Sequence, residues 1–215
     1  MNELDWMIDP DADDLETDIM PDTPLVMKVD AKVKSKAFLR REHLADFHRE
    51  LPAPGEAIHL VSNGRFDYWH FIPVTLDLLG RPVDELTAST WVMNRENVVE
   101  LIEMYDAGRL KKFSILTGEF FKRRCPAVVN LLIDEIQKRG QRYIASPNHT
   151  KIALFEAPPD YIVIEGSANW TSNPRIEQTV INNNRDLLEF HKRWMQKVLE
   201  GGIWRGRKEK PAKRP

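Results

Sequence analysis

Short apolar stretches alternate with segments of helical spacing along most of this chain. The short stretches have the length and apolar content of strands, and they lie at 57–64, 86–92, 111–117, 142–145, 149–151, 161–165 and 176–181. Elsewhere apolar residues recur every three or four positions, which predicts helices at 68–80, 126–139 and 186–199. A further helix is expected to begin after Asn94, whose side chain can cap it, and Gly140 is expected to end the helix at 126–139. This alternation predicts an α/β fold with a mixed, mostly parallel sheet flanked by helices on both faces.

Polar loops follow several of the predicted strands. In open α/β sheets, ligands bind beyond the carboxyl ends of the strands. The loops expected at that edge are rich in polar donors and span 62–65, 91–94, 117–124 and 146–149. The densest basic cluster of the expected folded region is Lys122, Arg123 and Arg124, and Arg175 lies on another loop. We interpret these four side chains as a rim that contacts nucleic-acid phosphates, with a solvated basic surface as the alternative.

The composition is that of one globular domain with tails. Of 215 residues, 42% are hydrophobic and 30% are charged. No apolar run reaches the length of a membrane span, and residues 1–14 lack the basic and apolar parts of a secretion signal. We therefore expect a cytoplasmic protein without a membrane partner. Cys125 is the single cysteine, which excludes an intramolecular disulfide and agrees with a reducing compartment.

The net charge of −2 hides two oppositely charged ends. Nine acidic residues and no Lys or Arg precede Lys28, whereas residues 205–215 hold six basic residues and one acidic residue. Such blocks are typical of solvated tails, although a basic tail can also bind phosphates and an acidic arm can mimic nucleic acid. We expect the following organisation: a disordered acidic arm at 1–25, a leading segment at 26–54, the folded domain at 55–201 and a basic tail at 202–215.

One short stretch carries the residues needed to attack a phosphodiester without metal. His149 supplies an imidazole nucleophile, and Lys151, two residues later on an extended backbone, is expected on the same face. The sequence Gly166-Ser167-Ala168-Asn169 then provides a tight turn with a hydroxyl and an amide. Lys151, Ser167 and Asn169 are the donors required to hold a phosphate and the charge that develops on it.

This stretch resembles the motif of the phospholipase D superfamily, which is His-x-Lys, four residues, Asp, a spacer and Gly-Ser-x-Asn. The acidic position carries Glu156, and the longer spacer contains 157–160, which we expect to be an inserted hairpin turn. The resemblance implies a supporting role for Glu156 in the site. It also implies that a glutamate downstream of Asn169 orients the histidine, and Glu177 is the candidate. From 57 to 201 the order of elements is similar to that of small phage and prophage members of this superfamily, which implies a bacterial or phage-infected cell.

The resemblance also implies a mechanism and an assembly. Hydrolysis of this kind needs two histidines, one that forms a phosphohistidine and one that protonates the leaving oxygen. The chain has one motif, so a symmetric homodimer is expected to bring two copies of His149 together. Two neighbouring imidazoles titrate as a coupled pair, which favours one neutral and one protonated ring. No metal or other cofactor is required.

Nuclease activity with little sequence specificity is the function that these features favour, with DNA and RNA both open as substrates. Trp170 follows Asn169 directly, where an indole at the mouth of a site can stack on a base, although core packing is the more usual role of such a residue. The first alternative is a non-catalytic nucleic-acid-binding protein on the same scaffold. The second is a phospholipase or an accessory factor of a phage or mobile element.

Overall fold

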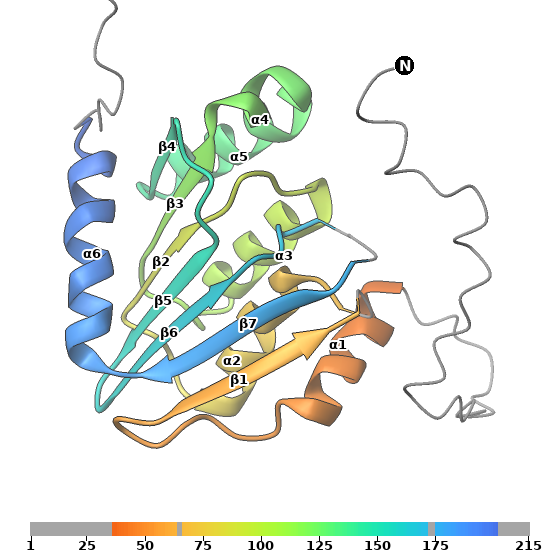
Figure 1. Cartoon of the computed structure of the whole chain (residues 1–215). Helices are drawn as coiled ribbons and strands as arrows, with labels where there is room; N and C mark the ends of the chain where they lie inside the picture. Colours follow the sequence, from red (N-terminus) through yellow and green to blue (C-terminus); the bar gives the residue numbers. More distant parts are fainter. Residues whose placement is uncertain (1–35, 64–65, 172–174, 202–215) are drawn as a thin grey trace, which may run out of the picture. The chain divides into compact units, whose positions relative to one another are not determined.

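Seven strands form one sheet in the computed structural model, which describes residues 36–63, 66–171 and 175–201 (Figure 1). The strands are β1 (Ala57–Ser62), β2 (Glu85–Ser89), β3 (Phe113–Gly118), β4 (Arg142–Ser146), β5 (Ile152–Ala157), β6 (Asp160–Gly166) and β7 (Glu177–Asn183). The helices are α1 (Lys36–Phe47), the 3-10 turn η2 (Tyr68–His70), α2 (Phe71–Leu79), α3 (Arg95–Asp106), α4 (Glu119–Arg124), α5 (Pro126–Lys138) and α6 (Arg185–Leu199). The prediction of an α/β fold is confirmed. The expected tails at 1–25 and 202–215 lie outside the described residues.

The order of the strands is β1-β7-β6-β5-β2-β3-β4. Only the pairs β2–β3 and β3–β4 are parallel, and the other four neighbouring pairs are antiparallel. The sheet is therefore mixed as predicted, but the prediction that it is mostly parallel was wrong. The reason is that β5, β6 and β7 follow one another as an antiparallel meander, and β5 pairs antiparallel with β2. The strand expected to be buried at 57–64 is instead the edge strand β1, which is partly exposed along its length.

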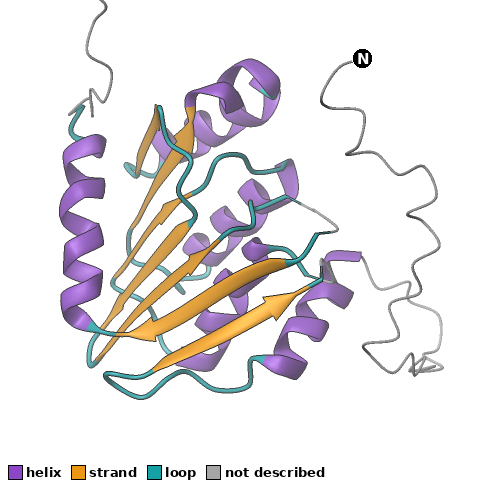
Figure 2. Cartoon of the chain, viewed as in Figure 1, coloured by secondary structure: helices purple, strands orange, loops and turns teal. Residues whose placement is uncertain are grey.

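Helices cover both faces of the sheet, as Figure 2 shows. Alternate residues of β5 point to opposite faces: Leu154 joins a core beneath α6, and Phe155 joins the larger core on the other face. The larger core includes Leu44 of α1 and Leu132 of α5. No helix in the described ranges is long and apolar enough to cross a membrane.

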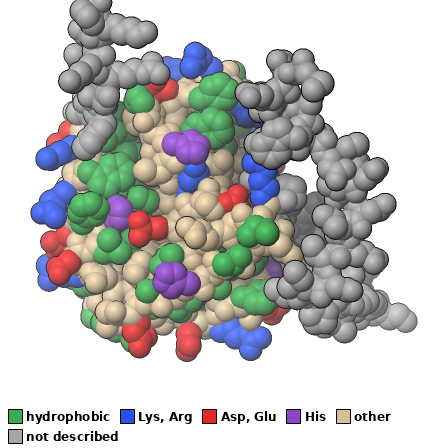
Figure 3. Space-filling view, viewed as in Figure 1, with side chains coloured by type: hydrophobic (Ala, Val, Ile, Leu, Met, Phe, Trp, Pro, Cys, Tyr) green, Lys and Arg blue, Asp and Glu red, His purple; other side chains and the backbone are tan. Residues whose placement is uncertain are grey.

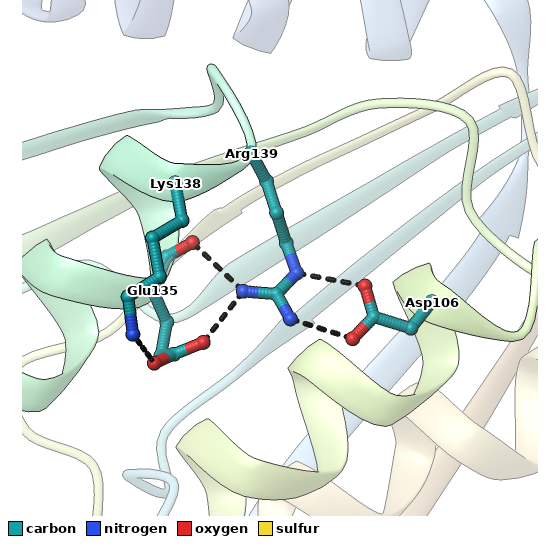
Figure 4. Close-up of polar contacts among 4 residues, drawn as sticks. All are labelled: Asp106, Glu135, Lys138 and Arg139. Carbon is teal, nitrogen blue, oxygen red and sulfur yellow. Dashed lines mark hydrogen bonds and ion pairs between the residues drawn. The ribbon is translucent and has the colours of Figure 1, made fainter.

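Local sequence sets the ends of the helices. The Asn94 side chain accepts a hydrogen bond of 2.8 Å from the Asn97 amide, which confirms the predicted cap of α3. At the far end of α3, Asp106 binds the guanidinium of Arg139 with two bonds of 2.7 and 2.6 Å (Figure 4). Arg139 also bonds to Glu135, so this network joins the carboxyl ends of α3 and α5. Gly140 then takes a φ of +63°, which ends the α5 segment.

Strand register gathers one set of strand ends along a single edge of the sheet. Ser89 at the end of β2 pairs with Ile152 at the start of β5, and Ile152 pairs in turn with Glu165 near the end of β6. Gly118 at the end of β3 pairs with Ser146 at the end of β4. We name this boundary, formed by the ends of β1–β4 and β6 and the starts of β5 and β7, the site edge.

Candidate active site

The structure brings four of the predicted site residues together at the site edge. His149 and Lys151 directly precede β5, Ser167 directly follows β6, and Glu177 begins β7. Backbone hydrogen bonds continue beyond the strands: the Gly166 amide donates to the Lys151 carbonyl at 3.1 Å, and the Ser167 amide donates to the Gln178 carbonyl at 3.1 Å. The β5–β6–β7 meander therefore fixes the relative positions of these residues.

Lys151 lies directly against the His149 imidazole. Its Nζ lies 3.0 Å from His149 Nδ1 and donates to the His149 carbonyl oxygen at 2.9 Å. Lys151 is only 7% exposed, whereas His149 is exposed to solvent. Burial lowers the pKa of the Lys151 ammonium, and the nearby carboxylate of Glu177 partly offsets this effect. A buried ammonium beside an exposed imidazole is an arrangement that can bind a phosphate while a nucleophile attacks it.

Ser167 and Glu177 form a second pair at this edge. The Ser167 hydroxyl donates to the Glu177 carboxylate and accepts a hydrogen bond of 3.1 Å from the Gln178 amide. Since Glu177 also acts electrostatically on Lys151, its charge links the serine to the lysine. The predicted cluster of His149, Lys151, Ser167 and Glu177 is thus one connected group.

Asn169 has a buried polar atom without a partner among the described residues, whereas the Trp170 side chain is fully packed. The Asn169 Oδ1 is buried and accepts no hydrogen bond from any residue in the described part of the chain. Trp170 is 0% exposed and its ring centroid lies 4.9 Å from that of Trp69. Its predicted role in stacking on a nucleic-acid base was therefore wrong, because the indole packs in the core.

Gly166 is required by the packing beneath the turn. A Cβ at this position would lie 2.7 Å from the ring of Tyr68, which is closer than real side chains approach. The Tyr68 hydroxyl donates to the Ile164 carbonyl at 2.6 Å, which holds the ring in place. The small residue at the head of Gly-Ser-Ala-Asn thus lets the turn lie flat on Tyr68.

Glu156 lies away from this cluster. It sits near the opposite end of β5, five residues and about 17 Å of extended chain from Lys151. There it forms an ion pair with Lys192 of α6, which also binds Glu85. The prediction of Glu156 as a site residue was therefore wrong, and its observed contacts join α6 to the sheet. The turn after it, Pro158–Pro159, closes the β5–β6 hairpin as predicted.

The loop that presents His149 is held by a polar network that the sequence reasoning missed. Asn148 Nδ2 donates to Ser89 Oγ at 2.8 Å, and Asn148 Oδ1 accepts from the Thr150 amide at 3.0 Å. The Thr150 hydroxyl lies 2.6 Å from Ser89 Oγ. An asparagine directly before the motif histidine, in Ser-Pro-Asn-His, was the available signal, because asparagine favours such local turns.

The predicted basic rim lies on helix α4 and beside β7. Lys122, Arg123 and Arg124 form the exposed last turn of α4, a short helix at the end of β3 that was expected to be a loop. Arg175 is exposed and precedes β7. Since β3 ends and β7 begins at the site edge, all four basic side chains belong to loops or helices at that edge.

Two stacked aromatic rings, of which Trp91 lies beside His149, were also missed. The Trp91 ring centroid lies 5.3 Å from that of His149, and the Phe120 ring stacks on Trp91 at 5.5 Å with an interplanar angle of 11°. Neither ring was assigned to the site from the sequence. In the described ranges, no group of three or more His, Cys, Asp or Glu side chains is placed to hold a metal ion.

Comparisons with known proteins find similarity in structure only. No protein-family model matches the chain, and no curated protein matches it in sequence. Among solved structures, polyphosphate kinase from Porphyromonas gingivalis is 15% identical with a TM-score of 0.52, over 72% of this chain and 27% of that one. Nuc from Salmonella typhimurium, a phospholipase D family member, is 17% identical with a TM-score of 0.48, over 66% of this chain and 93% of that one.

A third solved structure is NucT from Helicobacter pylori, which is 14% identical with a TM-score of 0.47, over 67% of this chain and 97% of that one. At identities this low, similarity concerns the fold and not the activity. The similarity to polyphosphate kinase, over 72% of this chain, therefore shows a shared α/β fold and nothing about activity.

Proposed function

We propose that this protein is a metal-independent phosphodiesterase, and specifically a nuclease of low sequence specificity that uses His149 as its nucleophile. The observation that carries the proposal is the Lys151 ammonium, buried and 3.0 Å from His149 Nδ1. Ser167 and Glu177 are coupled to it at the same edge. An imidazole, an ammonium and a hydroxyl so arranged provide a nucleophile and donors for phosphate oxygens without further groups.

In the proposed reaction, a neutral His149 attacks phosphorus. A P–N bond forms, the P–O bond to the leaving group breaks, and the leaving oxygen takes a proton from a second imidazole. That second imidazole then accepts a proton from water, whose oxygen attacks phosphorus and releases His149. Lys151 and the Asn169 amide donate to the non-bridging oxygens, and the Ser167 hydroxyl joins them when it turns from Glu177 to the bound phosphate.

The second imidazole is proposed to be His149 of another copy of this chain. The exposure of His149 supports this, because an exposed ring can meet its symmetry mate across a two-fold axis. Loss of the dimer by dilution is then expected to abolish turnover while each subunit stays folded. Sedimentation at the assay concentration measures this, and a fully active monomer contradicts the composite site.

The proposed substrate class follows from charge. The exposed basic turn of α4 and Arg175 flank the site edge, and lysine and arginine side chains bind nucleic-acid phosphates without reading sequence. DNA and RNA share this backbone chemistry, so the assay includes both.

The test is cleavage of DNA and RNA in excess chelator by the wild type and by His149→Ala. Turnover by the wild type and a loss of at least about a thousandfold in the variant is the expected result. His43→Ala, at an exposed position on α1, is the matched control and is expected to retain full activity. Strict dependence on magnesium contradicts histidine chemistry. Binding without turnover by the wild type favours a non-catalytic nucleic-acid-binding protein instead.

The covalent intermediate is tested with a substrate that carries labelled phosphorus. After a quench without acid, the label is expected to remain attached to the wild-type protein. Phosphohistidine is labile to acid and stable to base, so a label from a phosphorus-labelled substrate should show that stability and be absent from His149→Ala. A label of opposite stability contradicts a histidine nucleophile.

A further inference from the structure

Three side chains follow one another outward from the His149 ring, each in contact with the next. Trp91 lies next to the imidazole, with ring centroids 5.3 Å apart, and Phe120 stacks face to face on Trp91. The Arg123 guanidinium lies 5.9 Å from the centre of the Phe120 ring. We name Trp91, Phe120 and Arg123 the aromatic layer.

The main chain holds the aromatic layer in a fixed position. The Gly118 amide donates to the Trp91 carbonyl at 3.2 Å, so the Trp91 backbone is tied to the end of β3. The indole lies so close over Gly118 that a Cβ there would be 2.4 Å from Trp91 Cδ1. Phe120 and Arg123 project from α4, which begins at the next residue. The layer is therefore set by the same strand end that contributes to the site edge.

The outer part of the aromatic layer is exposed and borders positive charge. Phe120 is 42% exposed and Trp91 is half-buried; among the other described Phe, Tyr and Trp rings, only Phe47 and Phe190 are as exposed as Phe120. Lys122, Arg123 and Arg124 on the same helix are all exposed. Figure 3 shows hydrophobic side chains between a histidine and the Lys or Arg side chains at the top of the view. The ring contacts place Trp91 and Phe120 between the His149 imidazole and the Arg123 guanidinium.

We infer that the aromatic layer binds an unpaired nucleobase next to the phosphate held at His149, so that the site prefers single-stranded nucleic acid. This inference rests on the proposed phosphodiesterase function. Each base of a strand is joined to its phosphate through a single sugar, so a base that flanks the bound phosphate lies close enough to meet rings next to His149. Bases in a duplex are stacked on one another and offer no free face, whereas an unpaired base can stack on Phe120.

The combination of positive charge and a stacking surface also selects among phosphodiesters. A phospholipid carries a phosphate but no flat ring, so it can satisfy the cations and not the stacking surface. A single strand satisfies both, because its phosphates can reach Lys122 and Arg124 while a base takes the place of the exposed Arg123 guanidinium against Phe120. Stacking is tolerant of sequence because every base has an aromatic face, which agrees with low sequence specificity.

The test compares two fluorescein-labelled oligomers of equal length and charge, an oligothymidylate and the same backbone without bases. Binding is measured by anisotropy in a His149→Gln background so that both oligomers stay intact. Phe120→Ala is expected to weaken binding of the oligothymidylate about tenfold, a typical loss for one stacking ring, and to leave the abasic oligomer unchanged. Phe120→Trp is expected to restore the affinity. Lys122→Ala is the matched control and should weaken both oligomers alike.

Equal effects of Phe120→Ala on the two oligomers overturn the inference. So does conversion of the dimer to a monomer by Phe120→Ala in sedimentation, because the layer is then an interface between copies of the chain. Cleavage by the protein with native His149 is measured separately in chelator. Failure of that cleavage overturns the proposed function, whereas cleavage that is equally fast on single strands and duplexes overturns only the preference inferred here.

Discussion

His48, which follows α1, provides a test of the structure through pH and stability. The side chain is 2% exposed, and its ring centroid lies 6.1 Å from that of Phe71. Neither ring nitrogen has a hydrogen-bond partner in the described part of the chain. Burial lowers the pKa of this imidazole from 6.5 to about 4, because a charged ring cannot be solvated there.

The sign of the effect on stability follows from this shift. Between the native and the unfolded pKa, the unfolded chain binds the proton and the native chain does not, so acid favours unfolding. The stability that neutral His48 maintains is complete above pH 6.5 and is lost as the pH falls towards 4. For these two pKa values the loss is about 2 kcal/mol at pH 5 and about 3 kcal/mol at pH 4.

The perturbation is His48→Leu, which replaces the imidazole by an apolar side chain of similar size and removes the titrating group. Urea unfolding, followed by tryptophan fluorescence at one protein concentration, gives the free energy of unfolding near pH 7.5 and near pH 5. The wild type is expected to lose about 2 kcal/mol more than the variant between these conditions. His43→Leu, on the exposed face of α1, controls for the substitution of a histidine by leucine. Parallel pH profiles of the wild type and His48→Leu refute the reasoning.

Three further predictions concern the site and its surroundings. Gly166→Ala places a Cβ against the Tyr68 ring and is expected to cost about 1–3 kcal/mol in urea unfolding and to reduce cleavage; unchanged stability contradicts the packing described. Glu156→Gln breaks the ion pair with Lys192 and is expected to lower stability by about 1 kcal/mol or less while kcat stays unchanged; a large loss of kcat restores a role in the site. Because burial lowers the pKa of Lys151, cleavage should decline at a lower alkaline pH than an ordinary lysine permits, and Lys151→Arg should extend activity to higher pH; identical profiles oppose a cationic role.

The sequence predicted the parts of the site that are close together in the chain. His149, Lys151 and Ser167 are joined by one hairpin, whose pairing follows from two apolar strands and the Pro158–Pro159 turn. Because the hairpin alone sets their separation, a motif in the sequence is enough to place them.

The rest of the site depends on contacts between distant segments. Trp91 reaches His149 because β2 ends beside the start of β5, and Phe120 reaches Trp91 because β3 ends beside β2; that order of strands cannot be inferred from periodicity. Helix α4 has six residues, too few for a helical repeat to be recognised. Glu156 was assigned to the site because of its spacing from His149 in the motif. That spacing does not reveal that an extended strand carries Glu156 away from the site edge.

The β5–β6 hairpin explains how the spacer of the motif can vary. The residues that we assign to the chemistry lie at the open end of the hairpin, and the Pro158–Pro159 turn lies at its closed end. Adding one residue to each strand moves the turn outward by about 3.4 Å and leaves the pairing of Ile152 with Glu165 as it is. Insertions balanced across the turn therefore leave the site unchanged, whereas a single extra residue on one strand shifts every pair between it and the site edge. For chains of this kind, the parity of the spacer is a better criterion of an intact site than its length.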